Sequence, residues 1–136
     1  MLLKNKTAVI TGCNRGIGKK ILEVFSENGS TVFACTRNIS EEFKSEISEL
    51  KKKFNNEIIP VQFDLNNETQ LKEAATKILQ SGKPIDILVN NAATIHTAIF
   101  QMTSIKKLKE LFEVDFFAQT NFTQYILKSM IKNKKG

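Results

Sequence analysis

Short apolar runs alternate with longer amphipathic segments along the whole chain. The apolar runs are rich in β-branched residues and predict strands at Thr7–Thr11, Thr31–Cys35, Ile58–Phe63 and Ile85–Val89. Between and after them, apolar residues recur every three or four positions, which is typical of helices with one buried face. These patterns predict helices that begin at Gly16, after Ser40, after Asn66 or Asn67, and a long one over residues 104–132.

This alternation predicts an α/β fold with a parallel sheet covered by helices on both faces. The strands are apolar throughout, as expected of parallel strands that are buried on both sides. Right-handed crossovers from a central first strand predict the order 3-2-1-4, a Rossmann-type doubly wound sheet. Pro60 indicates an edge position for the third strand, because proline donates no ladder hydrogen bond.

The fourth predicted strand points to a larger fold. Ile85–Val89 is apolar on both faces, yet the order 3-2-1-4 leaves it at an edge. It holds no lysine, proline or bulge signal that would prevent further pairing. We therefore expect residues 1–136 to form the first half of a larger fold that continues with a fifth strand. A partner chain that covers this edge is the alternative.

Composition narrows the range of partners. The 136 residues are 41% hydrophobic and 25% charged, as in ordinary globular proteins. The net charge is +6, but apart from Lys51–Lys53 and Lys132–Lys135 the lysines are scattered and not interleaved with aromatic residues, so we expect no nucleic-acid partner. No apolar run approaches the ~20 residues that span a bilayer, so we expect no membrane association. Cys13 and Cys35 lack metal-ligand spacing, which favours reduced thiols, a cytoplasmic location and no metal site.

The strongest chemical signal is the glycine-rich stretch TGCNRGIG at Thr11–Gly18, directly after the first strand. Its glycines, Gly12, Gly16 and Gly18, allow a tight turn and a close approach of a ligand to the backbone. The free N–H groups at the start of the following helix favour an anion, and the helix dipole adds to that preference. The stretch therefore predicts a site for the phosphates of a nucleotide cofactor.

Further residues stand where the same site needs them. Arg37 follows the second strand and Arg15 lies inside the glycine turn, and both are cations suited to a 2′-phosphate; simple surface solvation is the alternative. Asp64-Leu65 ends the third strand, where a carboxylate can accept a hydrogen bond from an adenine amino group; a helix cap is the alternative. Asn90–Ala93 ends the fourth strand with amides and small residues against which a flat ligand can lie; a plain turn is the alternative.

Together these motifs resemble the classical short-chain dehydrogenase/reductase family over the whole chain, and within it the 3-oxoacyl-(acyl-carrier-protein) reductase-like group. Asp86–Ala93 is similar to the family's D-x-L-V-N-N-A-G stretch. The resemblance implies NADP(H), with NAD(H) as the alternative, and hydride transfer to or from a small carbonyl or alcohol substrate. It also implies homo-oligomers built through the long helix 104–132. The cofactor-binding residues that it implies are Gly12, Asn14, Arg15, Gly16, Ile17, Gly18, Arg37, Asp64, Leu65, Asn91, Ala92 and Ala93.

Two positions depart from the family's pattern. Ala93 replaces the last glycine of the family's stretch. Asp115 stands where the resemblance implies an asparagine that helps to hold a water in the proton relay, which makes Asp115 the one candidate catalytic residue. It shares a helical stripe with Ala118 and Phe122, so we expect it to face inward, with a solvated carboxylate as the alternative. An ionised aspartate accepts hydrogen bonds but donates none, so the relay would need rearranging unless the acid stays protonated.

The family's catalytic serine and Tyr-x-x-x-Lys pair are missing. Tyr125 is the only tyrosine and is followed four residues later by Ser129, so we expect it to serve packing or an interface. The lone histidine, His96, is expected at the surface or in a substrate loop. We therefore expect an NADPH-dependent carbonyl reductase, with a 3-oxoacyl compound as a candidate substrate, whose residues 1–136 are inactive alone. A non-catalytic dinucleotide-binding or regulatory module is the alternative.

Overall fold

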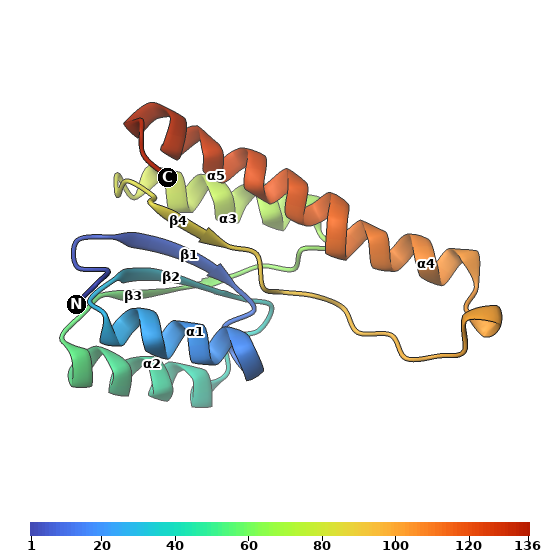
Figure 1. Ribbon diagram of the computed structural model, residues 1–136, viewed down its shortest axis with the longest axis horizontal. Helices are drawn as coiled ribbons and strands as arrows, with labels where there is room; N and C mark the ends of the chain where they lie inside the picture. The colour runs from blue at the N-terminus through green and yellow to red at the C-terminus, as the bar shows by residue number, and fades with distance from the viewer.

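The computed structural model describes residues 1–136 and alternates strands with helices along the chain (Figure 1). The strands are β1 (Thr7–Thr11), β2 (Thr31–Thr36), β3 (Ile58–Gln62) and β4 (Ile87–Val89). The helices are α1 (Gly16–Glu27), α2 (Glu41–Phe54), α3 (Glu68–Gln80), α4 (Ile105–Phe112) and α5 (Gln119–Asn133). None of them combines the length and the apolar character that crossing a bilayer requires.

All strand pairs are parallel, in the order β3-β2-β1-β4, which confirms the predicted Rossmann-like topology. Helices α1 and α2 cover one face of the sheet, and α3 and α5 cover the other (Figure 1). Pro60 lies in β3 at the edge, as its missing N–H predicts. All strands point the same way, so their carboxyl ends and the loops that follow them meet at one edge of the sheet.

The fourth strand is shorter than predicted, because side chains hold its first residues before the ladder begins. The backbone N–H of Ile85 donates to Oγ of Ser129 on α5 at 3.2 Å. Asp86 exchanges bonds with Thr7: its N–H donates to the Thr7 carbonyl, and its Oδ2 accepts the Thr7 N–H, both at 2.9 Å. Burial raises the pKa of Asp86, but the Thr7 N–H and the Lys6 ammonium outweigh it, so the net pKa is lowered.

The predicted long helix is interrupted. Its start is capped by Ser104, whose Oγ accepts the Lys107 N–H at 3.1 Å, and it ends at Asn133. Between α4 and α5, however, Glu113–Ala118 is π-helical. Periodicity cannot reveal such a segment, because one wider turn barely changes which residues face inward. π-helical turns occur frequently at functional sites.

The first turn of α1 also differs from expectation. Helical spacing groups Ile17 with Ile21, Leu22 and Phe25, which predicts that it faces the core, but it is 75% exposed. This turn directly follows the glycine-rich loop, beyond the carboxyl end of β1 (Figure 1). Leu22, on the same face farther along the helix, is fully buried.

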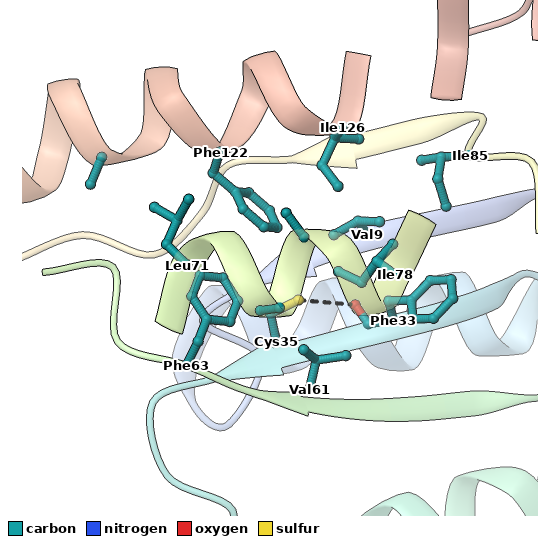
Figure 2. Close-up of a cluster of buried hydrophobic side chains, with 13 residues drawn as sticks. Val9, Phe33, Cys35, Val61, Phe63, Leu71, Ile78, Ile85, Phe122 and Ile126 are labelled. Atoms are coloured by element: carbon teal, nitrogen blue, oxygen red, sulfur yellow. Dashed lines mark hydrogen bonds between the residues drawn. The ribbon is translucent and has the colours of Figure 1, made fainter. Parts of the chain in front are cut away.

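The larger core cluster lies between the sheet and the helix pair α3 and α5 (Figure 2). Phe122 reaches down from α5 to Phe63, and their ring centroids lie 5.0 Å apart. Ile78 of α3 and Ile126 of α5 fill the space over Val9 (Figure 2). This packing fixes α5, and with it the π-helical segment, relative to the carboxyl edge of the sheet.

Replacing Phe122 by alanine should therefore destabilise the fold strongly. Phe122 is 0% exposed, and removing a buried phenylalanine costs about 3–5 kcal/mol of unfolding free energy. Phe117→Ala is the matched control, since Phe117, in the π-helical segment that leads into α5, is 57% exposed. Urea denaturation followed by circular dichroism measures both variants. Equal losses for the two would contradict the packing described.

Candidate functional site

The glycine-rich loop turns sharply where β1 ends. Gly12 has a φ of +72° and Gly16 a φ of +56°, in the left-handed region that favours glycine. A Cβ on Gly12 would also lie 2.9 Å from Nδ2 of Asn91 and 3.0 Å from Cα of Ala92. A Cβ on Gly18 would collide with the Gly12 carbonyl. The loop therefore needs glycine for close packing at Gly12 and Gly18, whereas around Gly16 the space is open.

The start of α1 presents unused backbone donors. Arg15 is the N-cap residue and makes no capping hydrogen bond through its side chain. The first helical bond runs from the Lys19 N–H to the Arg15 carbonyl at 3.2 Å. Before it, the N–H groups of residues 14–18 donate no hydrogen bond within the chain. Donors of this kind beside open space are suited to bind an anion.

Thr11 and Asn91 brace this loop against the end of β4. Oγ1 of Thr11 accepts the backbone N–H groups of both Asn91 and Ala92 at 3.0 Å. Nδ2 of Asn91 in turn donates to the carbonyls of Thr11 at 3.0 Å and Gly12 at 3.2 Å. Asn91 was predicted as a cofactor residue; the structure commits its amide nitrogen to shaping the loop. Thr11 was missed as a single residue because its role appears only once β1 and β4 are neighbours.

The predicted cations lie free at the same edge. Arg15 in the loop and Arg37 directly after β2 are exposed, and neither takes part in an ion pair within the chain. Unpaired guanidinium groups remain available for an external phosphate. Asn14, between the loop glycines, is exposed as well.

Asp64 and Leu65 follow β3 at the far side of this edge. Asp64 does not cap a helix: α3 is capped by Asn67, whose Oδ1 accepts the Gln70 N–H at 3.1 Å. Instead Oδ1 of Asp64 accepts the Asn66 N–H at 2.9 Å and holds the turn in place. Leu65 packs against the larger core cluster. The half-buried carboxylate of Asp64 thus stands at the strand end where a ligand's amino group was expected.

Asp115 lies in the π-helical segment, and the expectation that it faces inward is wrong. It is exposed, and its Oδ1 accepts the Thr94 N–H at 2.7 Å. Two further side chains at helical spacing, which the sequence reading missed, act in the same way. Gln119 donates through Nε2 to the Ala92 carbonyl, and Oγ1 of Thr123 accepts from Nδ2 of Asn90 at 2.9 Å. The polar stripe at positions 115, 119 and 123 was the available signal.

The remaining groups considered are the cysteine in the loop, the histidine and the tyrosine. Cys13 lies within the loop but is buried, and burial raises the pKa of its thiol to about 12, so it stays protonated. No group of His, Cys, Asp and Glu side chains is arranged to hold a metal ion. His96 is exposed in the segment after β4. Tyr125 packs against the core, with the Lys128 ammonium 4.8 Å from the centre of its ring.

Comparisons with known proteins identify the family to which the chain belongs. The profile of the short chain dehydrogenase family matches residues 6–136, so the chain belongs to the short-chain dehydrogenase/reductase family. Dehydrogenase/reductase SDR family member 7B of Rattus norvegicus is 32% identical over 138 residues, which are 98% of this chain and 42% of the relative. The 3-oxoacyl-(acyl-carrier-protein) reductase of Aquifex aeolicus is 32% identical over 134 residues, which are 98% of this chain and 54% of the relative.

A solved structure shares the fold closely. L-sorbose reductase from Gluconobacter frateurii, complexed with NADPH and L-sorbose, superimposes with a TM-score of 0.85 at 26% identity, over 94% of this chain and 48% of that one. The chain therefore spans about half the length of the relatives and structures that it matches. Short-chain dehydrogenases/reductases are oxidoreductases, and the family match extends over all the residues described above.

The brace between Thr11 and Asn91 makes a direct prediction. Thr11→Val keeps the shape of the side chain but leaves the N–H groups of Asn91 and Ala92 without their acceptor, which should cost about 2–4 kcal/mol of unfolding free energy. Thr7→Val is the control, because the Thr7 hydroxyl on the same strand makes no hydrogen bond within the chain. Chemical denaturation of both variants tests this. If Thr11→Val unfolds like Thr7→Val, the hydroxyl does not hold the loop.

Proposed function

We propose that this chain holds NADP(H) in a short-chain dehydrogenase/reductase that reduces a carbonyl group. The observation that carries the proposal is the row of unused N–H groups at residues 14–18, next to the open space around Gly16. A pyrophosphate would satisfy these donors and favour the positive end of the α1 dipole. Without an anion the donors are left to water.

The order of the strands orients the cofactor. A dinucleotide lies across the carboxyl ends of the strands at the point where the strand order reverses, here between β1 and β4. With the pyrophosphate on α1, we place the adenosine half over β2 and β3, where Arg37 and Asp64 lie. Arg37 and Arg15 would then reach the 2′-phosphate that distinguishes NADP(H) from NAD(H). The nicotinamide half falls on the β4 side, over Asn91, Ala92 and Ala93.

When bound, the nicotinamide supplies the hydride, and this chain's residues bind and orient it. Residues 1–136 contain no Tyr-x-x-x-Lys pair, so we propose that the groups that protonate the substrate belong to a part of the protein corresponding to the other half of its relatives. The 3-oxoacyl substrate of one such relative is our candidate substrate class. A non-catalytic dinucleotide-binding role is the outcome if the full-length protein binds NADPH but oxidises it with no carbonyl substrate.

The rod formed by α4, the π-helical segment and α5 is our proposed surface for homo-oligomers. Along α4, a groove is lined by Ile105, Leu108, Phe112 and Phe117. Phe112 and Phe117 are both more than half exposed, and exposed apolar side chains that lie close together are typical of an interaction surface.

The free buried thiols, Cys13 and Cys35, fit the cytoplasmic location that we propose.

The preference for the phosphorylated cofactor is testable at Arg37. Arg37→Gln should weaken NADPH binding by roughly 10- to 100-fold, because a charge-assisted hydrogen bond is worth about 1.5–3 kcal/mol. NADH binding should change little, since NADH lacks the 2′-phosphate. Isothermal titration calorimetry measures both affinities.

Lys77→Gln serves as the control for net charge, because Lys77 lies on α3 on the opposite face of the sheet from α1. An equal loss of NADPH and NADH affinity at Arg37→Gln would contradict the assignment of Arg37 to the 2′-phosphate. If the unaltered chain binds neither dinucleotide, the proposed cofactor site itself is wrong.

A further inference from the structure

The segment directly after β4 is held from two sides. Toward β1, Asn91 is bound to Thr11 and Gly12. Toward the helical rod, alternate residues are bound one after another: Asn90 to Thr123, the Ala92 carbonyl to Gln119, and the Thr94 N–H to Asp115. An extended segment advances about 6.6 Å in two residues and a helix about 6 Å in four, so the two spacings match.

The bond from Gln119 determines how one peptide group points. Nε2 of Gln119 donates to the Ala92 carbonyl, so this carbonyl faces the rod. All peptide bonds are trans, which directs the N–H of Ala93 away from that carbonyl and hence away from the rod. The Ala93 N–H donates no hydrogen bond within the chain, and Ala93 is exposed. A free donor is thereby aimed out of the segment on the side away from α5.

We propose that Gln119 is a positioning residue for the nicotinamide half of the cofactor. It acts through the Ala92–Ala93 peptide, whose free N–H and adjacent methyl group it presents to the ligand. This inference rests on the proposed function, which places the nicotinamide half over Asn91, Ala92 and Ala93. Gln119 itself contacts only the protein, and its effect is therefore confined to the part of the ligand that meets this peptide.

Thr123 supports Gln119 along the same stripe. Its Oγ1 donates to the Gln119 carbonyl at 2.7 Å while it accepts from Asn90, so one hydroxyl links the helix backbone to the segment. The Gln119 side chain donates to the Ala92 carbonyl. Asn90 and Thr94, on either side of Ala92, are also bound to the rod, so the distance that the Gln119 side chain must span is set. A shift of the rod by a fraction of an ångström would move all three bonds together.

The test separates the two halves of the cofactor. Gln119→Met and Gln119→Glu keep the length of the side chain but remove the donor. Both should weaken binding of NADPH by about 5- to 20-fold, the effect of losing one half-buried hydrogen bond, and leave binding of adenosine 2′,5′-bisphosphate within roughly twofold. Titration calorimetry on the purified chain measures both ligands, and thermal unfolding without ligand checks that each variant folds.

Gln124→Met is the matched control, because Gln124 lies on the same helix, is exposed and makes no hydrogen bond through its side chain. It should leave both affinities unchanged. Equal weakening of NADPH and bisphosphate binding by the Gln119 variants would show that Gln119 merely supports the fold. Unchanged NADPH binding would show that the Ala92–Ala93 peptide does not contact the ligand. Either result overturns this inference and leaves the proposed function standing. If the unaltered chain binds neither ligand, the proposed function fails and this inference fails with it.

Discussion

The site depends on one hydroxyl group, that of Thr11. Its oxygen accepts the N–H groups of Asn91 and Ala92, so the end of β1 and the end of β4 cannot move apart without leaving two half-buried donors unpaired. The Asn91 amide closes the same contact from the other side by donating to the loop carbonyls. This contact presses Asn91 and Ala92 so close to Gly12 that no side chain fits there. This packing therefore requires glycine at position 12, where the chain turns from β1 toward the free donors of α1.

The contact between Thr11 and Asn91 holds one side of residues 90–94, and the helical rod holds the other side. Phe122 anchors α5 over the sheet through Phe63, and the rod then presents Asp115, Gln119 and Thr123 to residues 90–94. A segment held between a strand end and a helix has little freedom to adapt when a ligand arrives. Binding then loses less conformational entropy, which is how preorganised sites gain affinity. The π-helical segment that carries Asp115 belongs to this arrangement, since it lies where the rod meets Thr94.

The sequence predicted the architecture well because its signals are redundant. Apolar strands, helical periodicity and capping residues such as Ser40 and Asn67 all indicate the same order of elements, and the structure has that order. The predicted boundary of β4 was wrong because a side chain replaces a ladder hydrogen bond there: the Asp86 carboxylate accepts the Thr7 N–H. The prediction that Ile17 is buried was wrong because helical periodicity does not reveal where the covering sheet ends. The roles of Thr11, Gln119 and Thr123 depend on partners about 30 to 80 residues away, which no local pattern contains.

The central claim is that a dinucleotide lies across the ends of β1 and β4 and occupies the free donors of the chain. Amide hydrogen exchange of the purified chain, read residue by residue by NMR with and without NADPH, tests it most directly. The account predicts slower exchange at the amides of residues 14–18 and of Ala93 when NADPH is present, with the already bonded amides of Asn91 and Ala92 changing least. Slower exchange elsewhere on the chain, with those amides unaffected, would contradict it.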